Sequence, residues 1–413
     1  MIKNLVQQRN NVEHFVYSRI LKPFFFKHDP EAVHDRMAAF GKVLGKTSLT
    51  RAVVRSMFGY SDPILNQNIL GIHFKNPVGL SAGFDKNAEL IDIIPSIGFG
   101  FMEIGSITGE PCEGNPKPRL WRLPKSKGLV VYYGLKNDGS KAIAARLSKR
   151  LATRGQFTIP IGTSVAMTNC SANENIAAAV RDYVKAFTAL ADIGQYTTIN
   201  ISCPNTSGGQ PFIQPENLEV LLAAIDAAVD EIERKEKHKK SATPKPAKQK
   251  PIFVKFSPDM TMVQIDTLLD IIHCHRIDGV IATNLTKKKG NEKILDPLPE
   301  HGGVSGKPVE DLSNDLISHI YQRELKREQD FGKNQPKDKK KLVVIGTGGI
   351  FSAEDAYKKI RLGASLVQMI TGMVFEGPQV VSDINIGLSN LLARDGFTNI
   401  SEAVGSDVWM HGV

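Results

Sequence analysis

The sequence is poor in cysteine, and this scarcity excludes several classes of protein. Its 413 residues contain four cysteines, Cys112, Cys170, Cys203 and Cys274, which lie far apart. No CxxC pair and no Cys/His cluster is present, so a disulfide scaffold, a zinc ribbon and a cysteine-ligated iron–sulfur cluster are not expected. The sequence predicts no metal site, and a reducing compartment is the simplest inference.

Long apolar runs are missing too. No stretch approaches the roughly 20 apolar residues that a membrane-spanning helix requires. Near the N-terminus the apolar stretches are interrupted by Glu13, Arg19 and Lys22, which is not the pattern of a signal peptide.

The net charge of +9 comes from two short segments. Residues 234–250 carry eight Lys/Arg against one Glu, and residues 333–341 carry five Lys against one Asp. Because both segments contain almost no apolar residues, they are predicted to be solvated loops, with a basic interaction tail as the alternative. The rest of the chain is close to neutral, so no nucleic-acid partner is predicted.

The first 60 residues are predicted to form an N-terminal helical module. One apolar helical face consists of Val12, Phe15, Val16 and Ile20. Asp29 and Pro30 are typical of a helix start. The apolar face that follows them consists of Val33, Met37, Phe40 and Leu44. Two hypotheses stay open on the residues alone: a helical cap on the main domain, or a module whose apolar faces enter a lipid surface.

After residue 70 short apolar runs alternate with amphipathic segments. The runs cover 76–83, 99–108, 158–166, 196–205, 252–259, 278–284, 342–349 and 365–372. The amphipathic segments between them include 177–193, 216–232, 262–275 and 353–362. Such alternation predicts a parallel α/β domain, and eight units favour a (β/α)8 TIM barrel over a doubly wound sheet. The barrel domain is expected over 61–395, with lysine-rich insertions near 234–250 and 333–341 and a C-terminal tail at 396–413.

Polar residues gather at the carboxyl ends of these runs, where barrel enzymes build their active sites. They are Ser81, Lys86, Glu103, Ser106, the segment 200–205, Lys255, Thr283, Asn284, the segment 346–349 and Thr371. The seventh run ends in "VIGTGGIFSAED", where glycines let backbone amides approach a ligand and Ser352 and Asp355 form a capping pair. With Thr371 after the eighth run, this pattern predicts a phosphate site.

Two lysines and three asparagines are candidates for a planar ligand. Lys86 follows a strand end, where a surface salt bridge is the common alternative. Lys255 lies inside the apolar run "IFVKF", so its cation needs an anionic or electron-rich partner such as a reduced flavin. Asn200, Asn205 and Asn284 offer donors and acceptors for an amide-rich ring, although any one of them alone is compatible with a turn.

Cys203 lies in "NISCPNT", directly after a strand and before Pro204. Its neighbours are polar, so we interpret it as a general base or nucleophile in a loop over the barrel mouth. The alternative is an inert buried thiol, which is common for cysteine.

From about residue 14 to 385 the sequence resembles the dihydroorotate dehydrogenases, FMN-containing (β/α)8 enzymes of pyrimidine synthesis. The pieces that carry the resemblance are "NPVGLSAGFDKNAE", "EIGSIT…GNPKPRLWRL", "NISCPNT", "VKFSPD", "DGVIATN", "GGVSGKP", "IGTGGI" and "GASLVQMITG". "PFFFKHDPEAVHDRM" resembles the membrane-associating extension of the quinone-using class 2 branch, in which it forms the passage of quinone to the flavin.

The resemblance implies a role for each matching residue. It assigns FMN contacts to Ala82, Gly83, Lys86, Ser106, Asn200, Lys255, Thr283, Gly306, Gly348, Gly349, Ile370 and Thr371. It assigns the orotate-type ring to Lys86, Asn200, Asn205 and Asn284. It assigns removal of the C5 proton to Cys203, while a hydride passes from C6 to the flavin.

The sequence departs from the class 2 pattern at four places. Cys203 stands where class 2 has serine, and a thiol is the easier base to ionise. Val131 or Tyr132 replaces a ring-binding asparagine, and Leu285 replaces a ring-binding threonine. Residues 159–176 look more like class 1, with Pro160 in place of an FMN-contacting asparagine.

The resemblance therefore predicts a quinone-reducing dihydroorotate dehydrogenase. It would lie peripherally on a membrane, at the cytoplasmic face of a bacterial inner membrane, with a mitochondrial inner membrane left open. One alternative is an FMN oxidoreductase acting on another cyclic amide or uracil-like ring, because Val131 and Leu285 alter the ring contacts. The other is a paralogue that binds FMN without turnover.

Overall fold

The computed structural model describes residues 2–206, 208–238, 250–331 and 341–410. Most of the two lysine-rich segments lies outside these ranges, so the loop prediction for them is untested there. Residues 234–238 are described, and for these the loop prediction is wrong. They continue a long helix, in which Arg234 and Lys235 pair with Glu231 one turn earlier.

Eight parallel strands of the described chain close into a barrel, which confirms the predicted TIM barrel and excludes the doubly wound sheet. In chain order they are β3 (Val78–Leu80), β4 (Phe101–Ile107), β7 (Ile161–Val165), β8 (Tyr196–Asn200), β9 (Ile252–Phe256), β10 (Gly279–Ala282), β12 (Val343–Thr347) and β13 (Leu366–Met369). Almost every residue in them is buried. Continuous burial is typical of parallel strands that are covered on both faces.

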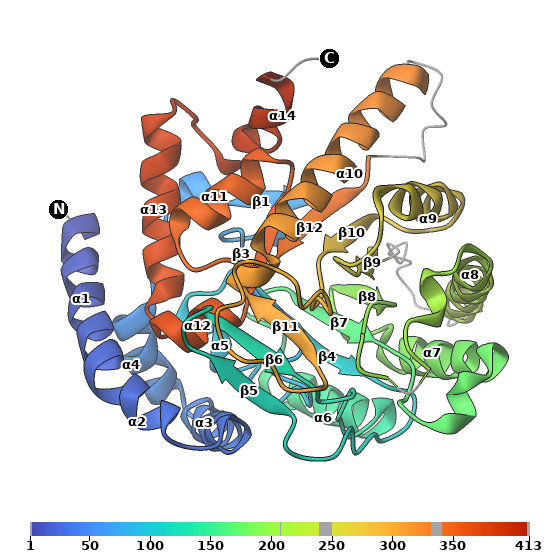
Figure 1. Cartoon of the computed structure of the whole chain (residues 1–413), viewed down its shortest axis with the longest axis horizontal. Coiled ribbons are helices and arrows are strands. Elements are labelled where there is room, and N and C mark those ends of the chain that lie inside the picture. Colours follow the sequence, from blue (N-terminus) through green and yellow to red (C-terminus); the bar gives the residue numbers. More distant parts are fainter. Residues whose placement is uncertain (1, 207, 239–249, 332–340, 411–413) are drawn as a thin grey trace.

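Helices surround the barrel (Figure 1). They are α5 (Ile94–Ile97), α6 (Ser140–Arg154), α7 (Ile176–Leu190), α8 (Pro215–His238), α9 (Met262–Cys274), α10 (Glu310–Phe331), α11 (Ala353–Arg361), α12 (Thr371–Glu376), α13 (Val380–Arg394) and α14 (Ser406–Met410). Short 3-10 turns cover Pro63–Leu65, Ser171–Glu174, Pro211–Ile213, Lys307–Val309 and Ile400–Ala403. The Ser352–Asp355 capping pair of α11 is confirmed as a reciprocal capping box.

The two ends of the barrel are built differently. At the amino end lies the hairpin β1 (Gln67–Ile69) and β2 (Ile72–Phe74), whose Phe74 packs in a cluster with the aromatic residues Phe101, Tyr196 and Phe253. A three-stranded antiparallel sheet follows the carboxyl ends of β4 and β10. It consists of β5 (Leu120–Leu123), β6 (Gly128–Val131) and β11 (Gly303–Gly306). The apolar runs did not predict this sheet, because β5 contains Arg122 and β11 consists of two glycines, a valine and a serine.

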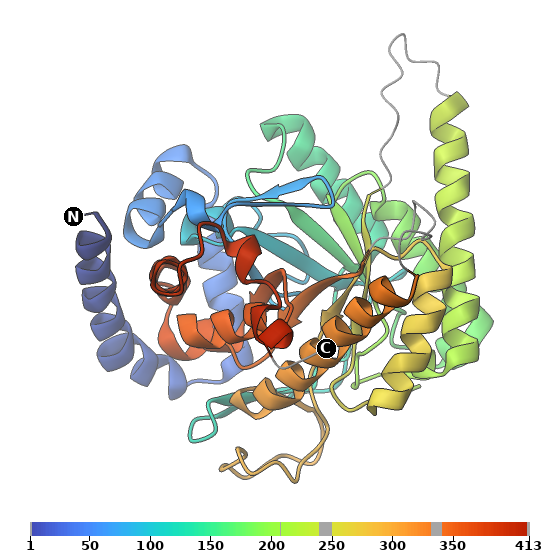
Figure 2. The same cartoon turned by 90° about the horizontal axis from the view of Figure 1, so that it is seen from above.

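The N-terminal module lies on one side of the barrel, opposite α8 (Figures 1 and 2). It comprises α1 (Ile2–Val16), a π-helical turn (Tyr17–Leu21), α2 (Lys22–Phe26), α3 (Pro30–Leu44) and α4 (Ser48–Phe58). The predicted cap of α3 is confirmed, since the Asp29 carboxylate accepts from the Ala32 amide at 2.8 Å. α1 docks on α13 through Asn10, whose amide donates to the Asp383 carboxylate at 2.8 Å.

Apolar side chains remain exposed on this module. They include Leu5, Val12, Phe15, Ile20, Phe24, Met37, Phe40, Val43, Leu49, Val53 and Met57. Among the described residues, no helix is both long and apolar enough to span a membrane.

Lys359 of α11 is fully buried and joins three elements. Its ammonium donates to Ser313 Oγ and Asn314 Oδ1, both at 2.8 Å, and Ser313 Oγ in turn donates to the Thr347 carbonyl at 2.8 Å. Burial lowers the pKa of Lys359 to about 7, because the charged form loses its hydration.

We expect Lys359 to make stability depend on pH. Between about pH 7 and 10 the unfolded chain still binds this proton while the folded chain releases it, so the free energy of unfolding rises with pH. Lys359→Met should make this rise smaller, whereas Lys358→Met, which changes an exposed neighbour, should leave it unchanged. Denaturant unfolding of the three proteins at pH 7, 8 and 9 measures the effect, and a variant curve parallel to wild type for Lys359→Met would contradict it.

Candidate active site

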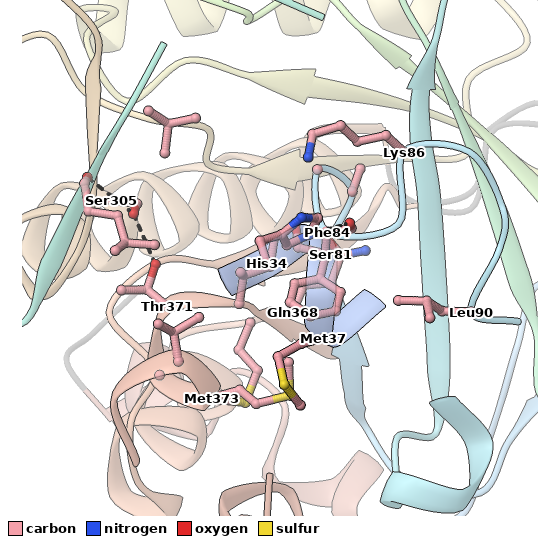
Figure 3. Close-up of a pocket in the computed structure, with 18 of the residues that line it drawn as sticks. His34, Met37, Ser81, Phe84, Lys86, Leu90, Ser305, Gln368, Thr371 and Met373 are labelled. Atoms are coloured by element: carbon pink, nitrogen blue, oxygen red, sulfur yellow. Dashed lines mark hydrogen bonds between the residues drawn. The ribbon is translucent and has the colours of Figure 1, made fainter. Parts of the chain in front are cut away.

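A cavity of about 910 Å³ lies at the carboxyl end of the barrel and continues between the barrel and the N-terminal helices. It is bounded by the barrel strand ends, by the β5–β6–β11 sheet and by α2, α3 and α4. Figure 3 shows the polar residues Ser81 and Lys86 in one part of it and Met37 and Met373 in another.

The structure brings every predicted site residue to this one cavity. Its lining includes Ala82, Gly83, Lys86, Ser106, Asn200, Cys203, Asn205, Lys255, Thr283, Asn284, Gly306, Gly348, Gly349, Ile370 and Thr371. The clustering at the carboxyl ends of the strands is therefore observed, while the individual roles stay predictions.

Lys255 is the buried cation of the site, with an exposed fraction of 4%. Its position within β9 points the ammonium into the barrel mouth, where it donates to Ser81 Oγ at 3.3 Å. Burial lowers the pKa of Lys255, and the negative charge of Glu103 opposes this shift. The carboxylate of Glu103 itself faces the barrel interior, where it accepts from Thr198 and Gln368, each at 3.1 Å.

Lys86 lies at the boundary between the barrel and the N-terminal module. Burial lowers its pKa to about 8, and the charge of Asp35 on α3 opposes the shift. Its ammonium lies 3.9 Å from the centroid of the Tyr133 ring, a cation–π contact. Tyr133 was not predicted, because nothing in "VVYYGL" marks one tyrosine of the pair as a cavity residue.

The three asparagines converge as predicted. Asn284 Nδ2 donates to Asn200 Oδ1 at 3.3 Å, and Asn200 Nδ2 donates to Ser106 Oγ at 2.8 Å. Asn205 Nδ2 donates to the Val131 carbonyl at 2.8 Å. Its other side-chain atom, Oδ1, is buried and has no hydrogen-bond partner among the described residues. A buried acceptor of this kind is suited to a donor group of a ligand.

The glycines of the β12 loop also line the cavity. Gly348 and Gly349 have φ values of +119° and +74°, and a Cβ on Gly349 would lie 2.4 Å from Glu310 Cβ. Ser305 and Thr371 are joined through their hydroxyls at 2.9 Å (Figure 3). The start of α11 contributes less than predicted, since the Asp355 carboxylate accepts from the amides of Phe351 and Ser352.

The Pro160 prediction is wrong in its placement. Pro160 precedes β7 and therefore lies at the amino end of that strand, away from the cavity. Ser164, near the carboxyl end of β7, is the residue that contacts the site, with its hydroxyl 2.8 Å from Ser106 Oγ. Pro160 and Ser164 are four residues apart, which is enough to separate the two ends of the five-residue strand β7.

Cys203 is partly buried at the cavity wall, between the asparagines. Burial raises the pKa of its thiol to about 11, while the Asn205 amide and the charges of Lys287 and Lys255 act in the opposite direction. The thiol is thus protonated at neutral pH, and its conversion to the thiolate requires a change of environment or of pH.

Comparison with known proteins identifies the family. The family described as dihydroorotate dehydrogenase matches residues 64–392. The chain belongs to the dihydroorotate dehydrogenase family, a family of flavin-dependent oxidoreductases. One curated relative, from Natronomonas pharaonis, is named dihydroorotate dehydrogenase (quinone). It is 36% identical over 392 residues, covering 94% of this chain and 99% of the relative.

A second relative with the same name comes from Gloeobacter violaceus. It is 36% identical over 387 residues, covering 94% of this chain and 98% of the relative. Among solved structures, the Eimeria tenella dihydroorotate dehydrogenase in complex with ferulenol aligns with a TM-score of 0.75 and 30% identity. That alignment covers 92% of this chain and 96% of the Eimeria chain. Because these alignments cover more than nine tenths of the chain, the likeness reaches into the N-terminal module.

The raised pKa of the Cys203 thiol can be tested without measuring turnover. Because its pKa is about 11, Cys203 should react slowly with iodoacetamide at pH 7, and about tenfold faster for each pH unit up to pH 10. The exposed Cys170 and Cys274 should be modified first. Peptide mass spectrometry measures all three, and modification of Cys203 as fast as Cys170 at pH 7 would refute the assignment.

Proposed function

We propose that this protein oxidises (S)-dihydroorotate to orotate with FMN as cofactor and a membrane quinone as electron acceptor, a step of pyrimidine (UMP) synthesis. One observation carries the proposal: a buried lysine, three asparagines and a thiol converge on one cavity. The chain that forms this cavity matches quinone-dependent dihydroorotate dehydrogenases over nearly its full length.

The residues present fit a flavin mononucleotide. Gly306, Gly348 and Gly349 line the cavity with positive φ angles, and a side chain at any of them would crowd the protein itself, at Lys127, Val309 or Glu310. These positions therefore present backbone at the edge where a phosphate would lie. Lys255 supplies a buried positive charge with no carboxylate ion-paired to it among the described residues. Such a cation stabilises negative charge on a neighbouring ring. When bound, FMN supplies the hydride acceptor for C6 of the substrate and passes electrons on to the quinone.

The substrate ring is held by Asn200, Asn205 and Asn284 together with Lys86. Asn205 Oδ1 accepts from a ring N–H, which satisfies an acceptor that is otherwise unpaired. Cys203 takes the C5 proton, and the protein as a whole excludes water from the reacting atoms. Val131 and Leu285 leave this ring with fewer polar contacts than the class 2 pattern provides. The names of the relatives nevertheless favour neither an oxidoreductase for another cyclic amide nor a paralogue without turnover.

The apolar part of the cavity suits a quinone. Its walls come from α2, α3 and α4 and include Phe25, Val33, Met37, Phe40, Leu49 and Val53. This lining is continuous with the polar part around Lys86, so a lipid-soluble acceptor has a route to the cofactor that avoids bulk water.

The thiol base gives the first functional test. Anaerobic mixing of the holoenzyme with dihydroorotate should bleach the flavin absorbance in wild type, and Cys203→Ala should slow it by about 10²–10⁴-fold. Because the base must be a thiolate, the wild-type rate should rise as the pH increases toward about 11, and this rise should be lost in Cys203→Ala. Cys170→Ala, at an exposed thiol, is the matched control. A bound flavin that stays oxidised in wild type would overturn the substrate assignment.

We propose further that the exposed apolar side chains of the N-terminal module rest on a lipid surface. The protein is then a peripheral membrane protein, placed at the cytoplasmic face of a bacterial inner membrane. Support comes from the apolar residues exposed on α1–α4, with Phe15 and Phe24 exposed to 62% and 60%.

Vesicle binding tests the membrane proposal. Phe15→Glu/Phe24→Glu should reduce cosedimentation with phosphatidylcholine/phosphatidylglycerol vesicles, because two charges must then be desolvated at the interface. Val263→Glu changes an apolar residue of α9 that is exposed to 75%, on the other side of the barrel (Figure 1), and should have no effect. An equal loss of vesicle binding in both variants, or no loss in either, would refute the assignment of this surface.

A further inference from the structure

A buried ion pair joins the N-terminal module to the barrel. Glu31 in the first turn of α3 and Arg119 just before β5 are exposed to only 3% and 5%. The Arg119 guanidinium donates from Nη2 to Glu31 Oε1 at 2.9 Å and from Nε to Oε2 at 3.1 Å. This side-on, bidentate geometry fixes the plane of the guanidinium.

The remaining guanidinium nitrogen holds the loop that leads into β5. Nη1 of Arg119 donates to the carbonyls of Glu113 and Asn115, at 2.9 and 2.8 Å. The carboxylate on α3 therefore orients the guanidinium, and the guanidinium orients the backbone at Asn115.

Asn115 in turn contacts the substrate asparagine. Its Nδ2 donates to the backbone carbonyl of Asn205 at 2.9 Å, and its Oδ1 accepts from Asn169 Nδ2 at 3.1 Å. Gly134 allows this approach, since it has a φ of +63° and a Cβ there would lie 2.6 Å from Asn115 Cγ. Asn205 is thus held through its backbone by Asn115 and through its own Nδ2 by the Val131 carbonyl.

We propose that Glu31, Arg119 and Asn115 are positioning residues that direct Asn205 Oδ1 toward the dihydroorotate ring. The seating of α3 on the barrel is thereby coupled to substrate binding. This inference rests on the proposed function. Glu31, Arg119 and Asn205 are buried and Asn115 is partly buried, so the members of this chain of directional hydrogen bonds have few substitute partners in water. Such a chain transmits small displacements. Linkage then requires that substrate binding also strengthens the seating of α3.

Orotate binding to the FMN-loaded protein, followed through the flavin spectrum, is the main test. Glu31→Gln and Arg119→Lys should each weaken orotate binding by about tenfold, a size typical of coupling between two sites. Arg119→Lys keeps the positive charge and loses only the bidentate geometry of the guanidinium. If charge alone mattered, this variant would bind orotate with wild-type affinity. The KM for dihydroorotate should rise in both variants.

Lys42→Ala is the matched control. It breaks an exposed ion pair of 2.6 Å between Lys42 and Glu89 that also joins α3 to the barrel, and within the described chain neither of these side chains bonds to a residue of the site. It should leave orotate affinity unchanged. A loss equal to that of Glu31→Gln would mean that general loosening of α3 is responsible, and would overturn the proposal.

Asn115→Ala tests the order of the chain without altering a buried charge. If the residues act in series, Glu31→Gln/Asn115→Ala should bind orotate no more weakly than Asn115→Ala alone. Additive losses, or wild-type affinity in Arg119→Lys, would overturn the proposal.

Amide hydrogen exchange over residues 199–206 separates this inference from the proposed function. Glu31→Gln, Arg119→Lys and Asn115→Ala should each exchange faster there than wild type and Lys42→Ala, with no substrate present. If wild type neither binds orotate nor is reduced by dihydroorotate, the proposed function fails and the exchange data still decide on the network. Unchanged exchange in all three variants would overturn the network.

Discussion

Closure of the parallel barrel is the constraint on which the rest of this structure depends. It places β9 between β8 and β10 and brings β3 beside β13, so that Lys255 reaches Ser81 although 174 residues separate them. Because the strands are buried along their length, polar side chains can be accommodated where the strands end. The cavity is the consequence of that closure rather than of any single loop.

Low polarity around the cavity sets the behaviour of its ionisable groups. Burial disfavours the charged forms of Lys255, Lys86 and Cys203 alike, which lowers the pKa of each lysine and raises that of the thiol. Groups in this condition gain most from a bound ligand that carries complementary charge. Burial of these groups therefore destabilises the free protein, and it strengthens their electrostatic interactions with a bound ligand because little water screens them.

The N-terminal module combines two kinds of surface. Toward the barrel it makes specific polar contacts, such as Asn10 with Asp383 and Glu31 with Arg119. Away from the barrel it leaves large apolar side chains exposed. Directional contacts on its inner side fix the position of the module on the barrel, even when its outer side contacts a deformable partner. The cavity shared by the two parts requires this fixed position.

Much of this architecture follows from the sequence by itself. The alternation of apolar runs with amphipathic segments determines the eight-strand barrel, the Asp29–Pro30 pair determines the start of α3, and polar residues after strand ends mark the mouth. These features depend on neighbours in the chain, so a local pattern suffices to predict them. Only the tertiary structure decided the rest: the antiparallel sheet of four-residue strands, the cavity position of Tyr133, the displacement of Pro160 to the far end of β7, and the pairing of Glu31 with Arg119. Each of these depends on contacts between residues distant in the chain, whose geometry is set by packing and not by spacing.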